Sequence, residues 1–215
     1  MASHRASRSV SLLVSGFFAC SGPAHHAAPP APPAVAEPTT PVAPVAPAPS
    51  ADQQLEAFGK DFLDSYLKRS PTEATQAGDH RYDGLWPDIT PAGEAANRKW
   101  VEDTRAALGK LPRDGLSLQN QIDAQILDDQ LRAALFAIDE LKPFDTDPLV
   151  YTDLIGSGID PLVTREFGTL DQRMTALQGR LDGIPALVAA ARQRLGHPAK
   201  IQTETAIQQN KGLIG

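Results

Sequence analysis

From Ala51 onward, apolar residues recur at intervals of three and four along nearly the whole chain. This spacing places them on one face of an α-helix, because a helix completes a turn in about 3.6 residues. No run alternates between apolar and polar residues for long enough to predict a strand, and no segment repeats. The sequence therefore predicts an all-α domain of packed antiparallel helices over residues 51–215.

Proline, glycine and capping residues divide this region into helices. Ser70-Pro71-Thr72-Glu73 has the form of a capping box with proline at the first helical position. Residues 79–87 are predicted to form a loop. The predicted helices cover residues 51–67, 71–78, 91–112, 118–143, 170–195 and 201 onward.

Two segments interrupt this pattern. Residues 147–168 are interrupted by Pro148, Gly156, Gly158 and Pro161, so we expect short helices and turns there. Pro185 is expected to kink the helix that follows residue 170, or to end it and restart it.

The clearest predicted helix follows Ser117 and has both an apolar and an acidic face. We expect the acidic residues to form its solvated face. The apolar face is Leu118, Ile122, Ile126, Leu131, Leu135, Ile138 and Leu141, and the acidic face is Asp123, Asp128, Asp129, Asp139 and Glu140.

The first 50 residues have the pattern of an export leader and a tether. Arg5 and Arg8 precede an apolar run, residues 10–19, that ends at the single cysteine, Cys20. A run of about ten residues is too short to span a bilayer. Exported bacterial lipoproteins begin in this way, so residues 1–20 are predicted to be a signal peptide with a lipobox-like end, and Cys20 the site of lipid attachment.

An ordinary signal peptide that is cut after Ala24 and discards Cys20 is the alternative. Residues 21–50 contain 10 Pro and 9 Ala, and bury too little apolar surface to become ordered. We expect a disordered, semi-stiff linker between membrane and domain. Ser21 does not resemble an inner-membrane retention signal, which favours the outer membrane facing the periplasm.

The sequence contains no complete catalytic constellation. Of five histidines only His80 and His197 lie beyond the leader and linker, and no two are spaced for a zinc-peptidase helix. The stretch Ile155–Ile159 does not have the spacing of a serine nucleophile elbow. A net charge of −6 without a basic stripe gives no reason to expect nucleic acid as a partner.

The best cluster of polar side chains lies in the loop from Asp79 to Asp83, and contains His80 and Tyr82. Acid, imidazole, phenol and guanidinium groups together suit hydrogen bonding to a polar ligand. The alternative is a connecting loop with Tyr82, Leu85 and Trp86 in the core and its charged side chains in water.

Eight short pieces of sequence, in this order and spacing, resemble a family of bacterial proteins known as domain of unknown function 885. Its members are often exported lipoproteins and are much longer than this chain. The pieces are Phe58–Leu67, Pro71–Thr75, Gly78–Asp83, Leu116–Asp123, Asp147–Tyr151, Arg165–Phe167, Arg180–Pro185 and Thr203–Ile207.

The resemblance implies a zinc-dependent metallopeptidase whose zinc ligands and general base lie in a C-terminal half with a His-Glu…Pro-Gly-His motif. No position of this sequence matches that motif, so no catalytic or zinc-binding residue is carried over, and zinc is expected only where that half is present. Within the matched part, His80, Tyr82 and Asp83 are expected to line a cleft.

The sequence thus favours the N-terminal helical part of a metallopeptidase-like envelope lipoprotein, anchored through lipid and acting on peptides. The helical pattern of Ile201–Gly215 stops without a cap, so we expect the chain to be truncated. The alternative is a membrane-tethered helical binding or scaffold module without catalysis. A degraded gene is a third hypothesis.

Overall fold

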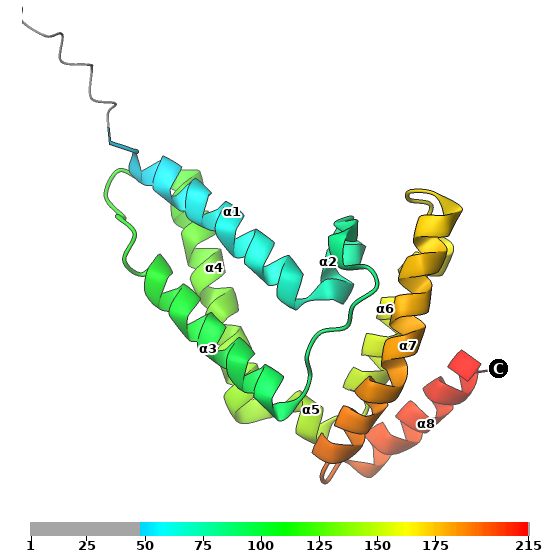
Figure 1. Ribbon diagram of the computed structural model, residues 1–215. Helices are drawn as coiled ribbons and strands as arrows, with labels where there is room; N and C mark the ends of the chain where they lie inside the picture. Colours follow the sequence, from blue (N-terminus) through cyan, green and yellow to red (C-terminus); the bar gives the residue numbers. More distant parts are fainter. Residues whose placement is uncertain (1–47, 215) are drawn as a thin grey trace, which may run out of the picture. The chain divides into compact units, whose positions relative to one another are not determined.

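Residues 48–214 are described by a computed structural model (Figure 1). Residues 1–47, with Cys20 and most of the predicted linker, lie outside them. Within residues 48–214 all regular structure is helical, which confirms the predicted all-α class. The helices are α1 (Ala51–Arg69), α2 (Pro71–Ala77), a 3-10 turn η1 (His80–Tyr82), α3 (Pro91–Leu108), α4 (Leu118–Phe136), a π-helical turn η2 (Ala137–Leu141), α5 (Pro143–Thr146), α6 (Leu149–Thr164), α7 (Leu170–Arg194) and α8 (Lys200–Ile214).

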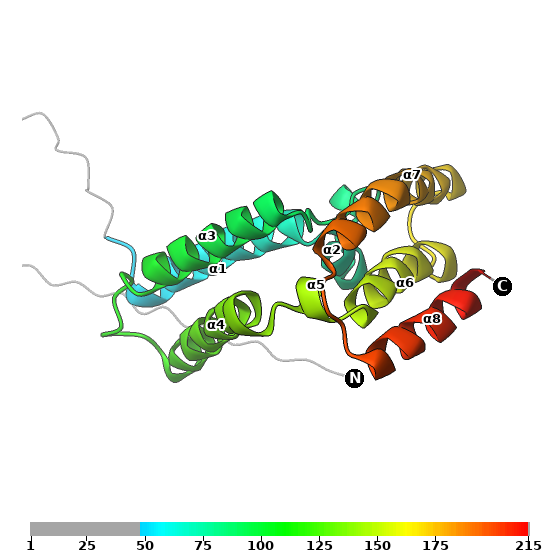
Figure 2. The ribbon, with the colours of Figure 1, turned by 90° about the horizontal axis from the view of Figure 1, so that it is seen from below.

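The helices pack in two neighbouring groups (Figures 1 and 2). Helix α3 lies beside α4, and α1 packs on both. Helix α6 packs against α7, α8 and α2, while the short α5 contacts η2, α6 and α7. Helix α2, which follows α1 directly, therefore links the two groups. None of these helices combines the length and apolarity needed to cross a membrane.

Each group has its own buried apolar cluster. The clusters remove large aliphatic side chains from water, which is the main force that holds such helices together. The first cluster is Leu55, Val101, Leu108, Leu116, Ala124 and Leu131, and the second is Ile89, Tyr151, Leu187 and Ala190.

Several helix ends follow the sequence signals. Thr90 and Ser117 cap α3 and α4 by accepting hydrogen bonds from main-chain N–H groups. Gly78 ends α2 in the left-handed conformation, at φ 86°. Ser70 makes no capping hydrogen bond through its side chain, so the predicted capping box there is wrong. Complete capping boxes lie at Ser50, before α1, and at Thr169, before α7.

The prediction of short helices and turns over residues 147–168 is wrong, because α6 runs unbroken from Leu149 to Thr164. Its Gly158 is not a helix breaker here. A Cβ at this position would overlap the ring of Trp86, so only glycine lets the indole reach the helix axis.

Helix α7 likewise continues through Pro185, and the predicted restart does not occur. At two glycines of α7, the loop that precedes α3 packs closely against the helix. A Cβ at Gly179 would lie 2.8 Å from the main-chain oxygen of Gly84, and one at Gly183 would overlap Trp86. Long-range packing, invisible in the local pattern, therefore explains why these glycines lie within helices.

The predicted apolar face of the clearest helix is wrong in part. Leu118, Ile122 and Ile126 are 73%, 46% and 54% exposed, while Leu131 is buried. Helix α4 packs mainly on α3, α1 and the η2 turn that follows it, so part of its broad apolar surface faces outward. The helix also ends earlier than predicted, at Phe136, where η2 begins.

Two residues of the predicted solvated face instead join helices. Arg105 Nε of α3 donates to Asp128 Oδ1 at 2.8 Å. Arg98 Nε donates to Asp139 Oδ1 at 2.7 Å. These ion pairs fix the register of α3 against α4 and η2, although as exposed pairs each adds little stability.

Candidate functional site

The loop singled out in the sequence connects α2 to α3 and is held by its own side chains. Asp79 accepts a hydrogen bond from the main-chain N–H of Arg81 at 3.1 Å. Arg81 also pairs with Asp64 of α1 at 2.6 Å and stacks on Tyr82, with its guanidinium carbon 5.1 Å from the ring centroid. The guanidinium of Arg81 therefore covers one face of the Tyr82 ring.

Asp83 is buried, at 5% exposure, despite its charge. Thr75 Oγ1 donates to its Oδ1 at 2.7 Å, and His80 Nδ1 lies 2.8 Å from its Oδ2. The His80 ring stacks on Phe167, with ring centroids 3.8 Å apart. The structure thus brings His80 and Asp83 together.

The alternative interpretation of this loop is wrong on two points. It placed the charged side chains in water, but Asp83 is buried. It placed Leu85 in the core, but Leu85 is 57% exposed. Trp86 is partly buried, as that interpretation expected.

Arg180 of α7 lies fully buried beneath the loop. Its Nε donates to the main-chain oxygen of Asp83 at 2.6 Å, and its Nη2 donates to Thr75 Oγ1 at 3.0 Å and to the Pro71 oxygen at 3.1 Å. Burial lowers the pKa of Arg180 to about 10, while the Asp83 carboxylate acts in the opposite direction. The guanidinium therefore stays charged at neutral pH and ties the loop to α2.

This buried network is structural, because its polar groups satisfy one another. His80, Tyr82 and Asp83 are absent from the lining of the pocket described next. Their role in lining a cleft stays a prediction.

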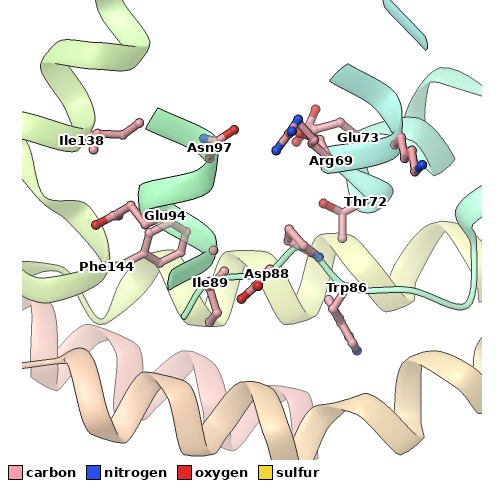
Figure 3. A pocket seen from close by; sticks show the side chains of 14 residues that line it. Arg69, Thr72, Glu73, Trp86, Asp88, Ile89, Glu94, Asn97, Ile138 and Phe144 are labelled. Carbon is pink, nitrogen blue, oxygen red and sulfur yellow. The ribbon is translucent and has the colours of Figure 1, made fainter. Parts of the chain in front are cut away.

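A pocket of about 450 Å³ lies where the end of α1, the start of α2, the loop, the start of α3 and α5 meet (Figure 3). Its lining combines both charges with apolar surface. The principal residues are Lys68, Arg69, Glu73, Trp86, Asp88, Ile89, Glu94, Asn97, Ile138 and Phe144.

The charged residues of this pocket are spread around it, and Glu73 lies close to Arg69 on the same side (Figure 3). Arg69 and Glu94 are on opposite sides, with Asp88 between them on the loop (Figure 3). Asp88 Oδ1 accepts from the N–H and the hydroxyl of Thr90 at 3.0 and 2.7 Å. Since a carboxylate has two oxygens, Asp88 keeps one oxygen for a further donor.

Arg194 supports the wall that carries Glu94. Its Nη2 donates to Glu94 Oε1 at 2.8 Å, its Nε to Asp145 Oδ1 at 2.9 Å and its Nη1 to the Ile89 oxygen at 2.8 Å. Burial alone would lower the pKa of Arg194, but the hydrogen bonds to Glu94 and Asp145 outweigh it and raise that pKa. The wall is therefore pre-organised, and Glu94 keeps its second oxygen.

The pocket has the groups to bind a ligand that carries both charges. Lys68 and Arg69 suit an anion such as a carboxylate, and Asp88 and Glu94 suit an ammonium group. Among the described residues, no three His, Cys, Asp or Glu side chains gather as a metal-binding group. The donors present therefore do not fit a zinc ion, which takes three or four such ligands.

Sequence reasoning missed the pocket and Arg194. The residues that line the pocket come from positions 68 to 144. Arg194, much later in the sequence, contacts the pocket wall through its hydrogen bond to Glu94. No local pattern brings these segments together. Arg180 belongs to one of the eight pieces of sequence that resemble the family, but nothing in the sequence indicated that its side chain is buried.

Comparison with known proteins agrees with the fold and the sequence pieces. The chain belongs to the family described as bacterial protein of unknown function (DUF885), which matches residues 71–215. No curated protein matches it.

Among solved structures, the chain is similar to "a putative lipoprotein of unknown function" from Shewanella oneidensis. The TM-score is 0.68 and the sequence identity 30%, over 77% of this chain and 29% of the other. This chain therefore spans less than a third of that relative.

Proposed function

We propose that this chain is the N-terminal, non-catalytic helical part of an envelope lipoprotein that resembles zinc-dependent metallopeptidases. In this proposal the pocket between α1, α2 and α3 belongs to one wall of a peptide-binding cleft. The zinc ligands and the general base come from the larger part that longer relatives carry outside the aligned region.

The observation that carries this proposal is that one pocket combines two basic residues at one end with two acidic residues on other elements, although Glu73 lies near the basic pair. Lys68 and Arg69 lie at the end of α1, whereas Asp88 and Glu94 lie on the loop and α3. A peptide with free ends offers a carboxylate to the first pair and an ammonium group to the second. Trp86 and Phe144 also line the pocket and add apolar surface to it.

Isothermal titration of the full chain, with Cys20→Ser to prevent acylation, tests the peptide-binding part. We expect alanyl-alanine to bind, and N-acetylation or C-terminal amidation to weaken binding at least fivefold. Lys68→Gln should weaken binding to a similar extent, while Lys60→Gln, on the same helix but outside the pocket, should not. Absence of binding at millimolar dipeptide would overturn this part.

The metallopeptidase resemblance is tested in the longer Shewanella oneidensis relative. We expect about one zinc per chain by mass spectrometry and hydrolysis of peptides that a chelator abolishes. A relative with neither zinc nor hydrolysis would overturn it.

Lipid attachment at Cys20 is supported by the similarity to the Shewanella oneidensis protein, which is described as "a putative lipoprotein". Palmitate labelling in a bacterial host should mark the wild-type chain and not Cys20→Ser. Sucrose-gradient fractionation should place the labelled chain in the outer membrane. Cleavage after Ala24 would instead leave a chain without Cys20 and without label.

A second function is favoured by one observation. The described residues form a ligand-sized pocket but gather no metal-binding group. These properties also suit a tethered binding or scaffold module of the envelope. Dipeptide binding by this chain, together with a zinc-free and inactive longer relative, would favour that function.

A further inference from the structure

Helices α6, α7 and α8 surround a second concave surface, which we call the α6–α8 groove. Its volume is about 970 Å³. Each helix contributes a row of residues at helical spacing. The rows are Ile155, Ile159 and Val163 of α6, Leu181, Ile184, Val188 and Ala191 of α7, and Thr203, Ala206, Ile207 and Asn210 of α8.

Large apolar side chains of this groove remain in contact with water. Val163 is 58% exposed, Leu181 45% and Ile207 49%, and they come from three different helices. Contiguous apolar surface of this kind marks an interaction site, because leaving it in water is unfavourable.

A buried hydroxyl on the groove also lacks a partner. Thr152 is 6% exposed, and its Oγ1 has no hydrogen-bond partner among the described residues. Buried polar atoms are nearly always paired. Because Thr152 Oγ1 is itself enclosed, the exposed apolar surface of the groove is what points to an occupant.

We propose that the α6–α8 groove holds an amphipathic helix from the larger part that longer relatives carry outside the aligned region. This inference rests on the proposed function, in which the chain acts together with that part. This chain aligns with only 29% of the solved relative, so that relative has many further residues from which a helix in the groove can come. A fourth helix on α6, α7 and α8 would complete a bundle-like core.

The groove defines the chemistry of this helix. Helix α8 has 15 residues and is about 22 Å long, so an occupant of about four turns matches it. Apolar residues at positions i, i+3, i+4 and i+7 would cover Leu181 and Val163. Asp160 and Arg192 lie on the groove, so a basic and an acidic residue are expected on the flanks of the occupant.

The first test measures exposure in the solved Shewanella oneidensis structure at the positions that align with Val163, Leu181 and Ile207. We expect each to be less than 10% exposed, covered by a helix from outside the aligned region. Exposure as high as in this chain would overturn the inference. Coverage by a second copy, a small apolar molecule or an aligned segment would also overturn it.

The second test compares Leu181→Asp in this full chain with the aligned substitution in the relative. Because Leu181 is more than half shielded here, we expect the melting temperature to fall in both proteins, and to fall by at least 5 °C more in the relative. Leu181→Met, which keeps the apolar contact, should be neutral in both. Equal shifts in the two proteins would overturn the inference, and the exposure measurement decides if the relative's variant does not fold.

The two proposals fail in different ways. A covered groove in a relative without zinc or hydrolysis would keep this inference and overturn the metallopeptidase proposal. An exposed groove in an active zinc enzyme would do the reverse.

Discussion

The indole Nε1 of Trp86 donates a 2.8 Å hydrogen bond to the main-chain oxygen of Arg180. The same ring lies against Gly158 of α6 and Gly183 of α7, and the Arg180 guanidinium carbon is 4.9 Å from its centroid. One loop residue therefore locks two helices that are distant from it in the sequence.

Gly158→Ala should destabilise the fold. The new Cβ would overlap the Trp86 ring, and overpacking of this kind costs about 1–3 kcal/mol. Gly156→Ala in the same helix is the matched control, because a Cβ there meets nothing within 4 Å. Alanine favours helix, so the control should gain up to about 1 kcal/mol. Equal melting temperatures for the two variants would contradict the assigned role of Gly158.

Arg180→Met should be among the most damaging substitutions. It removes every donor that Arg180 supplies to Asp83, Thr75 and Pro71, and breaking a buried ionic network costs about 3–5 kcal/mol. Urea unfolding of Arg180→Met, Asp83→Asn and the double variant measures this. Because the residues share one network, we expect the double variant to lose less than the sum. Additive losses would show that Arg180 and Asp83 act independently.

Much of the fold could be predicted from the sequence, because helix starts depend on local chemistry. Pro91 after Thr90 and Leu118 after Ser117 mark helix starts that the structure confirms. The prediction fails at Gly158, because contact with Trp86 from a distant loop, and not the local preference of glycine, decides the helix there. Pro185 lies within an unbroken α7, which the local pattern does not predict.

The candidate site was less accessible to sequence reasoning. His80 and Asp83 are three residues apart, so their hydrogen bond could be anticipated. The burial of Asp83 depends on Arg180, which is 97 positions away. A single sequence contains no signal for such a contact.

Acid should weaken the contact between the starts of α1 and α4. Hydrogen bonds from the Ser117 main chain and the Asn120 side chain lower the pKa of Asp52 below its ordinary value of 3.8, outweighing burial. The folded state thus holds the carboxylate in its charged form. This stabilisation is fully present above pH 3.8 and is lost as pH falls below it.

Melting temperatures at pH 6 and pH 3 test the Asp52 contact. The deficit of Asp52→Asn relative to wild type should be larger at pH 6 than at pH 3. Asp61→Asn, exposed on the same helix, should show no such change. A deficit that does not depend on pH would mean that the charge of Asp52 adds nothing.

Arg194→Leu should separate stability from ligand binding. The side chain is 3% exposed and joins α7 to Glu94 and Asp145, so its loss leaves two carboxylates without their cation. Because both carboxylates are partly exposed and water can replace the guanidinium, we expect a cost of about 2–3 kcal/mol. Arg192→Leu, exposed on the same helix, is the control and should change stability by less than about 0.5 kcal/mol.

Binding to the folded Arg194→Leu variant then reports on the pocket. If Arg194 holds Glu94 toward an ammonium group, dipeptide affinity should fall by at least threefold under conditions where the variant is fully folded. Arg194→Lys keeps the charge but not the planar fork of donors, so it should recover only part of that affinity. Unchanged affinity in both variants would show that Arg194 supports the fold without orienting the pocket wall.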